Sequence, residues 1–142
     1  MSEQTLIEIA KSQIAAFNDS DWEALRSICS ADVVYNEKGT NRKIEGIEAL
    51  IEANNAWKGL MADCYGHLEG VMVSGNWVIM ELKFTGTMTG PFISPEGVSI
   101  PANGKTLENP SVCLYRISEG KVVEMRHYFD MMNMMIQFDL IK

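Results

Sequence analysis

Apolar residues recur every three or four positions through the first half of the chain, which is the spacing of one face of a helix. The first such face comprises Leu6, Ala10, Ile14 and Phe17. Ser20 and Glu23 then have the form of a capping box, which predicts the start of a second helix. A third helix is expected from Gly46. Its inward face carries one polar residue among the apolar ones: Ile47, Leu50, Ile51, Asn54 and Trp57.

The second half of the chain changes to the period of two that is typical of strands. Four long strands are expected, over residues 67–73, 77–85, 106–117 and 121–129. A short strand over 33–36 precedes the third helix, the segment 86–104 is expected to be a loop, and a short helix follows Asp130. Pro110 has no backbone N–H to donate, so it predicts an edge or a bulge in its strand.

Helices grouped first and antiparallel strands grouped last indicate an α+β fold. We expect the three N-terminal helices to pack in a strongly curved, mainly antiparallel sheet, a cone-shaped roll that carries the short C-terminal helix at its end. Such a sheet has a concave face with room for a pocket. The chain has 142 residues, and a single domain over residues 1–142 is expected because single domains usually hold about 100–150 residues.

The net charge of −7 narrows the range of partners. Lys and Arg number 12 against 19 Asp and Glu, and the nearest approach to a basic cluster is Arg42-Lys43, so neither nucleic acid nor an anionic membrane is expected. Three widely spaced cysteines indicate free thiols in a reducing compartment. The chain shows no signal-peptide pattern and no apolar run of the roughly 18 residues that a membrane span needs, which favours a cytoplasmic protein.

Few residues suit metal or nucleotide chemistry. The histidines, His67 and His127, lack the companion ligands of a zinc site, so no metal is expected. Gly104-Lys105-Thr106 is similar to the end of a phosphate-binding loop, but Ser99 stands where that motif needs glycine, so nucleotide binding is not expected. Ten methionines, four of them within residues 131–135, are expected to fill the core beneath the last helix, and lining an apolar pocket is the alternative.

The last predicted strand carries the most informative pattern. One of its faces comprises Val123, Met125, His127 and Phe129, and the other comprises Glu124, Arg126, Tyr128 and Asp130. On the wall of a cavity the second row would supply acids, a base and a phenol for catalysis, whereas on a solvated face it is ordinary salt-bridge decoration. Asp130 also precedes the final helix, where Asp is a favoured N-cap, and the residue pattern alone favours that interpretation.

Six segments together carry a family pattern: residues 18–25 (NDSDWEAL), 46–50 (GIEAL), 84–91 (FTGTMTGP), 101–105 (PANGK), 115–124 (YRISEGKVVE), and Tyr128-Phe129-Asp130 with 137–140 (QFDL). They resemble the SnoaL-like polyketide cyclases, within the nuclear-transport-factor-like superfamily of cone-shaped α+β folds. In cyclases of this family an Asp at the end of the last long strand is the general base, and Asp130 matches that position. The resemblance implies a cofactor-free intramolecular aldol or isomerase-type reaction on a small apolar carbonyl compound.

The resemblance also implies roles for other residues. Asp130 would take a proton from a carbon flanked by carbonyls, and a neighbouring donor would protonate the ketone oxygen. Tyr128 and Arg126 share the predicted face of Asp130, so they rank ahead of His127 as that donor. Contacts to the substrate are expected from Tyr35, Trp57, Glu81 and Tyr115. The superfamily uses the outer face of the sheet for pairing, so a homodimer is expected.

Two alternatives stay open. Limonene-epoxide-hydrolase-like enzymes also end the last strand in Tyr-Phe-Asp, but they need Arg-x-Asp on a central strand, where this chain has Glu81-Leu82-Lys83 with the charges reversed. The other alternative is a non-catalytic small-molecule-binding dimer of the same fold. The position of Asp130 separates these interpretations, because both enzymes need its carboxylate in the cavity wall and a helix cap turns it toward solvent.

Overall fold

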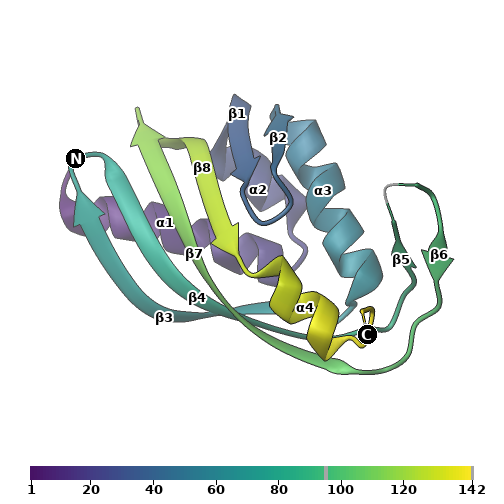
Figure 1. The fold of residues 1–142 in the computed structure, drawn as a ribbon. Helices are drawn as coiled ribbons and strands as arrows, with labels where there is room; N and C mark the ends of the chain where they lie inside the picture. The colour runs from purple at the N-terminus through teal and green to yellow at the C-terminus, as the bar shows by residue number, and fades with distance from the viewer. Residues whose placement is uncertain (95, 142) are drawn as a thin grey trace.

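The computed structural model describes residues 1–94 and 96–141, which form four helices and eight strands (Figure 1). The helices are α1 (Glu3–Asn18), α2 (Trp22–Ile28), α3 (Ile47–Leu60) and α4 (Met131–Gln137). The strands are β1 (Cys29–Glu37), β2 (Arg42–Glu45), β3 (Tyr65–Ser74), β4 (Trp77–Thr87), β5 (Phe92–Ile93), β6 (Ser99–Ile100), β7 (Thr106–Ser118) and β8 (Lys121–Phe129). Within the described ranges, every helix is too short or too polar to span a bilayer.

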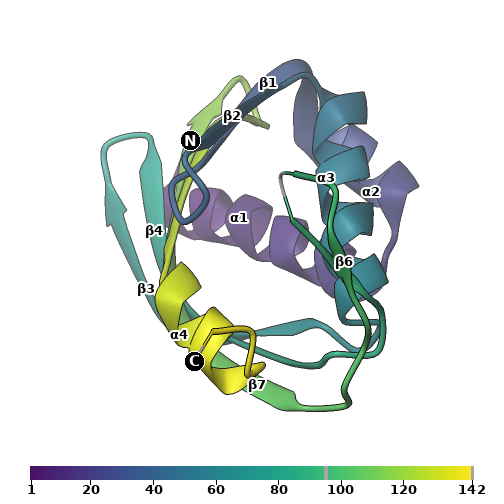
Figure 2. The ribbon, with the colours of Figure 1, turned by 45° about the vertical axis from the view of Figure 1, so that its right-hand side comes forward.

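Six strands form one curled sheet in the order β2-β1-β8-β7-β4-β3. All neighbouring strands in it are antiparallel except β1 and β8, which run parallel. Strands β5 and β6 pair separately. Figure 2 shows that the sheet bends around α1 while α3 lies across from it, so the concave face of the sheet is turned toward the helices. The predicted α+β fold with a curved, mainly antiparallel sheet is confirmed.

The alternation of side chains along the strands builds the core. Val78, Met80 and Leu82 of β4 are at most 2% exposed, because their shared face is turned toward α1 and α3. The four apolar residues predicted for the first helix face, from Leu6 to Phe17, are all buried. One stripe of α1 therefore packs into the concave sheet, and the opposite stripe is solvated.

The starts of the second and third helices differ in how well they were predicted. The capping box at Ser20 is wrong, because Asp21 is the N-cap of α2 and its carboxylate accepts from the Ala24 N–H at 3.1 Å. Ser20 instead has a φ of 52° and belongs to the turn between the helices. The start of α3 at Gly46 is confirmed, and its φ of 94° lies in the region that favours glycine.

The sheet contains pairings that the sequence pattern did not reveal. The predicted strand over 33–36 is part of the longer β1, and β2 was not expected at all. The segment 86–104, expected as a loop, contains the two-residue strands β5 and β6. Pro110 lies on the central strand β7 and pairs with Lys83 of β4 without a bulge. It lies one residue beyond the last pair with β8, at Ser111, so β7 is unpaired on that side of Pro110.

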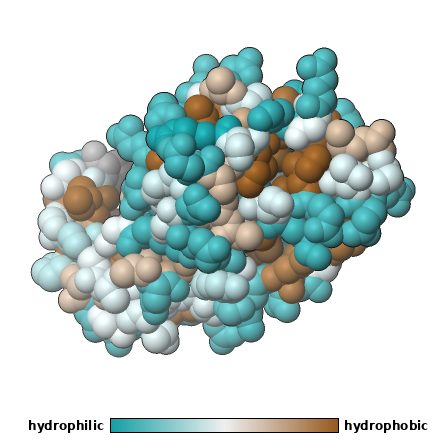
Figure 3. All heavy atoms as spheres, turned by 180° about the vertical axis from the view of Figure 1, so that it is seen from behind, coloured by the Kyte–Doolittle hydropathy of each residue, from teal (hydrophilic) through white to brown (hydrophobic). Residues whose placement is uncertain are grey.

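The side of the molecule opposite to the view of Figure 1 is covered largely by hydrophilic residues, with hydrophobic residues in separate patches (Figure 3). An ion-pair cluster links α2 and α3 at the surface. Arg26 of α2 donates to both carboxylate oxygens of Glu48 on α3, each at 2.9 Å, and also pairs with Glu23. Exposed pairs of this kind contribute little to stability, so the fold depends mainly on the buried interior.

Candidate active site

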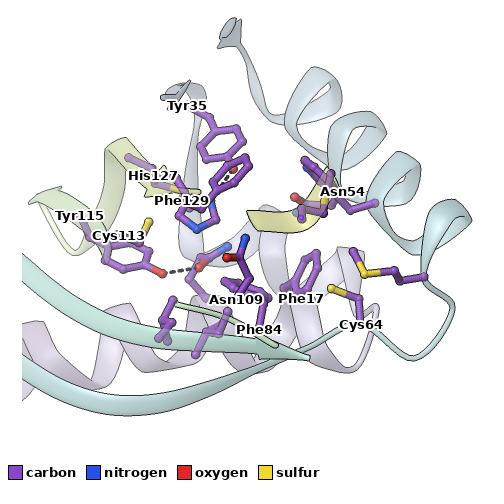
Figure 4. Close-up of a pocket in the computed structure, with 17 residues that line it drawn as sticks. Phe17, Tyr35, Asn54, Cys64, Phe84, Asn109, Cys113, Tyr115, His127 and Phe129 are labelled. Atoms are coloured by element: carbon purple, nitrogen blue, oxygen red, sulfur yellow. Dashed lines mark hydrogen bonds between the residues drawn. The ribbon is translucent and has the colours of Figure 1, made fainter. Parts of the chain in front are cut away.

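The concave face of the sheet, together with α1 and α3, forms a pocket whose walls are mainly apolar and aromatic (Figure 4). Its empty space is about 660 Å³ counted out to the open mouth. The aromatic rings of Phe17, Phe84 and Phe129 in its walls suit a flat apolar ligand. Its polar lining residues are Gln13, Tyr35, Asn54, Trp57, Asn109, Tyr115 and His127.

His127 lies on the pocket-facing side of β8 and is held at both ring nitrogens. Its Nδ1 shares a hydrogen bond of 2.8 Å with the Tyr35 hydroxyl on β1, and its Nε2 shares one of 3.2 Å with the Ser111 hydroxyl on β7. The aromatic rings of Phe84 and Phe129 flank the imidazole at centroid distances of 5.5 Å and 4.9 Å. The ring is thus fixed in orientation by three strands within apolar surroundings.

Burial sets the protonation of this group. Desolvation lowers the pKa of His127 to about 4, against a smaller opposing effect of the Glu37 carboxylate. Burial likewise raises the pKa of the Tyr35 phenol well above its ordinary value. At neutral pH the pair therefore consists of a neutral imidazole and a neutral hydroxyl, which can accept and donate a proton respectively.

A buried carboxylate lies behind this pair. Glu37 has no exposed surface and follows Tyr35 by two residues on β1. Its carboxylate accepts from the Trp57 indole N–H at 3.0 Å, from Arg42 Nη2 at 2.8 Å and from the Thr40 hydroxyl at 2.5 Å. These bonds lower the pKa of Glu37 despite burial, which opposes them. The network anchors Trp57, whose ring forms part of the pocket wall.

Other polar groups of the wall are engaged within the protein or kept neutral by burial. The Tyr115 hydroxyl donates to Gln13 Oε1 at 2.8 Å. Cys64 and Cys113 line the pocket, but burial raises the pKa of each thiol to about 12, so neither forms a thiolate at neutral pH. No group of three metal-ligand side chains was found within residues 1–94 and 96–141.

Four of the predicted site residues do share the pocket. Tyr35, Trp57, Tyr115 and His127 all line it. Glu81 does not: it is exposed on the outer face of β4, where the period of two directs it away from Leu82. Its placement in the pocket wall is corrected.

Lys83, which completes the Glu81-Leu82-Lys83 segment, also faces outward. Its Nζ pairs with Glu108 Oε1 at 3.1 Å. The charged residues that an epoxide hydrolase of the limonene type would need on this strand are thus outside the pocket.

The expectation that Arg126 and Tyr128 lie in the pocket wall is also corrected. The Tyr128 side chain is 47% exposed on the outer face of β8. Arg126 donates to Glu124 Oε2 at 2.8 Å and stacks over the Trp77 ring at 4.5 Å from its centroid. Strand alternation placed these two on the same face, as predicted, but that face is the convex one.

Asp130 lies one residue beyond β8 and caps α4. Its Oδ1 accepts from the Asn133 N–H at 2.9 Å, and the residue is exposed. Its backbone carbonyl, in contrast, accepts from Asn109 Nδ2 of the pocket wall at 3.1 Å. Because the cap holds the side chain outside the residues that line the pocket, the structure does not bring this carboxylate together with His127 and Tyr35.

Sequence reasoning missed several residues of the site. Glu37, Asn109 and Ser111 gave no signal, because each stands among residues that read as ordinary strand or turn positions. Gln13 and Asn54 did leave one, since each is a polar residue within an amphipathic helix, and Asn54 stood on the face predicted to be inward. Both are buried, at 4% and 6% exposure.

Comparisons with known proteins agree with this fold and pocket. A protein from Jannaschia sp. CCS1, whose name places it among the SnoaL-like polyketide cyclases, is 22% identical with a TM-score of 0.86, covering 100% of this chain and 98% of that one. IdmH from Streptomyces antibioticus, whose name places it among the polyketide cyclases, is 21% identical with a TM-score of 0.80. The match covers 94% of this chain and 98% of IdmH. A protein of unknown function with a cystatin-like fold from Xanthomonas campestris is 28% identical with a TM-score of 0.74, covering 94% and 97%.

These structural likenesses concern the fold. No curated protein matches the chain. The family model described as SnoaL-like polyketide cyclase matches residues 7–138, a range that runs from α1 to the residue after α4 and includes every pocket-lining side chain. The chain belongs to the SnoaL-like polyketide cyclase family.

Proposed function

We propose that the protein is a cofactor-free enzyme that moves protons on a small, largely apolar carbonyl compound held in the pocket. The observation that carries this proposal is His127, an ionisable side chain on the apolar wall whose two ring nitrogens are hydrogen-bonded to Tyr35 and Ser111. Family membership supports acid–base chemistry of the cyclase or isomerase type. A half-buried imidazole on an apolar wall, fixed between hydroxyl groups, is suited to that chemistry.

The low pKa of His127 selects the substrate. A base with a pKa of about 4 is weak, so it removes a proton readily only from a carbon that two flanking carbonyls have made acidic. Nε2 of His127 would accept that proton once the Ser111 hydroxyl rotates away from it, and the resulting imidazolium would donate through Nδ1 to the Tyr35 oxygen. The Tyr35 hydroxyl would donate to the enolate oxygen as charge develops there, which stabilises the transition state.

The proton then has two fates that balance the reaction. Returned from His127 to a different atom of the enolate, it completes an isomerisation. Alternatively, the enolate carbon attacks a second carbonyl of the same molecule, and the proton on His127 passes to the new alkoxide, which closes a ring by an aldol step. The apolar walls strengthen each charge interaction in this sequence.

The keto–enol interconversion of a β-keto ester tests the proposal without knowledge of the natural substrate. The substrate is ethyl 2-oxocyclohexanecarboxylate, and its conversion from enol to ketone is measured as a loss of enol absorbance in the presence of catalytic amounts of protein. We expect acceleration by the native protein, loss of it in His127→Phe, and a reduction in Tyr35→Phe. His67→Gln, which alters the surface histidine, is the matched control and should retain it. Acceleration that survives in His127→Phe would overturn the assignment.

A second candidate function, binding without catalysis, is favoured by one observation. Among the described residues that line the pocket there is no Asp or Glu, so the wall lacks the strong base that the family resemblance implied. Calorimetric binding of 2-tetralone, a flat apolar ketone, combined with no acceleration of the β-keto ester would favour this candidate over the enzyme.

We also propose that two copies pair through the outer face of the sheet. Met72 on β3 and Tyr128 on β8 expose 55% and 47% of their surface on that face. Light scattering after size-exclusion chromatography should give the mass of a dimer for the native protein and of a monomer for Met72→Glu combined with Tyr128→Glu. A native protein that elutes with the monomer mass contradicts this pairing.

A further inference from the structure

One buried polar atom of the pocket wall has no hydrogen-bond partner among the described residues. Within residues 1–94 and 96–141, two buried side-chain atoms lack a hydrogen-bond partner, Ser30 Oγ and Asn54 Nδ2. Of these two residues only Asn54 lines the pocket. An unpaired buried donor destabilises a fold because its hydration is lost without replacement. Folding therefore gives no reason for an amide at this position of α3.

The neighbouring polar groups cannot serve the same purpose as freely, because each is already bonded within the protein. The Trp57 N–H, one turn further along α3, donates to Glu37. Both ends of the Asn109 amide are engaged, with Nδ2 donating to the Asp130 carbonyl and Oδ1 accepting from Asn133 Nδ2. Asn54 is thus the amide on the α3 side of the pocket that a ligand can engage without breaking a bond within the protein, whereas the Gln13 amide on α1 is held through its Oε1 by the Tyr115 hydroxyl.

The position of Asn54 also indicates what it would recognise. It comes from α3, whereas His127 comes from β8 and Tyr115 from β7 on the sheet side (Figure 4). Among the described residues that line the pocket none is Lys or Arg, so the wall offers a carboxylate no counter-charge. A neutral acceptor such as a ketone oxygen fits this donor. Rotation of the terminal amide exchanges its nitrogen and oxygen, so the NH₂ group can turn toward the ligand while α3 stays in place.

We infer that Asn54 is the specificity-determining residue of the pocket, and that it donates a hydrogen bond to a ketone oxygen of the ligand from the side opposite the sheet. The choice of a ketone rests on the proposed function; the free donor does not. A site built to hydrogen-bond a polar group discriminates strongly against the analogue that lacks it, because the buried donor is then left unpaired.

A pair of ligands of equal shape tests this inference. Calorimetry measures the dissociation constants of 2-tetralone and of tetralin, the hydrocarbon without the carbonyl, for the native protein, Asn54→Leu and Asn55→Leu. We expect Asn54→Leu to shift the ratio of the two constants by about tenfold in favour of tetralin, the factor that one good hydrogen bond contributes. Asn55 is exposed on the same helix, so the same substitution there should leave the ratio unchanged.

The inference is overturned if the ratio in Asn54→Leu equals that of the native protein, or if both ligands weaken by the same factor, which would indicate a merely structural role. Should Asn54→Leu fail to fold, Asn54→Ala and its Asn55→Ala partner repeat the comparison. The outcome is separable from the proposed reaction. If the ratio of dissociation constants depends on Asn54 but the native protein does not accelerate the β-keto ester, the role of Asn54 in recognition stands and the proposed reaction fails. If the native protein accelerates the β-keto ester but the ratio is unchanged in Asn54→Leu, the reaction stands and the role of Asn54 fails.

Discussion

On the outer face of β8, Glu124 lies between two guanidinium groups and accepts from Arg116 at 3.3 Å and from Arg126 at 2.8 Å. On the inner face of the same strand, His127 lies between two hydroxyl groups, with partners on β1 and β7. Successive side chains of β8 alternate between these two faces. The two faces differ in their exposure to solvent. The Arg116 and Arg126 side chains of the outer face are 39% and 41% exposed, whereas desolvation is the largest influence on the pKa of His127 on the inner face.

The difference shows that a row of charges is weak grounds for a site. Exposed ion pairs are screened by water and contribute little, so the acid–base row on the outer face decorates the surface. A single neutral imidazole on an apolar wall has fewer charged neighbours but a more strongly shifted pKa, and such shifts accompany chemistry.

The largest expected effect is a difference in stability between substitutions of Glu37, behind the inner face, and Glu124, on the outer face. Glu37 pairs in register with His127 and is fully buried, so Glu37→Ala leaves the Trp57 N–H and the Thr40 hydroxyl without their acceptor. We expect a loss of about 4 kcal/mol in the free energy of unfolding, measured with urea. Glu124→Ala, the matched change on the outer face, should cost less than about 1 kcal/mol. Equal losses would remove the distinction.

The next effect is a dependence of stability on pH that belongs to the inner face. The pKa of His127 is about 4 in the folded protein and near the ordinary 6.5 when unfolded, so the unfolded chain binds more protons between these values. Its contribution is therefore fully present above pH 6.5 and is lost as the pH falls toward 4, by at most about 3 kcal/mol.

Urea titrations of the native protein and of His127→Phe between pH 4 and 7 measure this effect as a difference in slope. The variant should lose less stability than the native protein over this range, because it has no imidazole to protonate. His67→Gln should follow the native slope. If His127→Phe and the native protein lose stability in parallel, the imidazole does not titrate with a depressed pKa.

Much of the fold followed from periodicity, while the site followed from it only in part. Spacing of two residues assigned Met125, His127 and Phe129 to one face of β8, and all three line the pocket. What spacing could not decide is which face of a strand is concave, since that depends on how the whole sheet curls. The outer face was predicted as the site because Asp130 was assigned to it. Asp130 lies one residue past the end of β8, at the cap of α4, where strand alternation no longer applies.

Contacts between segments far apart in the chain were beyond the sequence pattern. Strand β1 pairs in parallel with β8, some ninety residues later, and this pairing sets Tyr35 beside His127, at 92 residues' separation. Neither segment contains a local sign of the other. Asn54 shows what was available: a polar residue on an apolar helix face predicts a buried polar group, but only the structure shows that its partner is missing.

A smaller effect distinguishes two glycines, one packed against an inner-face side chain and one in open space. Gly39, in the turn between β1 and β2, has no room for a side chain, because a Cβ there would lie 2.4 Å from the Phe129 ring. Gly39→Ala should push that ring toward the pocket and cost about 2 kcal/mol. Gly59 on α3 has nothing within 4 Å, so Gly59→Ala should instead stabilise by about 0.5–1 kcal/mol. Thermal unfolding measures both. Equal melting temperatures for Gly39→Ala and the native protein would show that the Phe129 ring can move aside without cost.

The smallest expected effect on stability, and the one that bears most directly on the two faces, is at Asp130. Asn caps helices about as well as Asp, so Asp130→Asn should leave the melting temperature nearly unchanged, whereas Asp130→Ala should cost about 1 kcal/mol. If proton transfer runs through His127, Asp130→Asn also retains the acceleration of the β-keto ester. If the acceleration instead disappears while the fold is kept, the Asp130 carboxylate must reach the substrate during turnover. The Asn133 N–H bond that holds it at the helix start would then have to open, and the base would come from the end of β8 and not from its inner face.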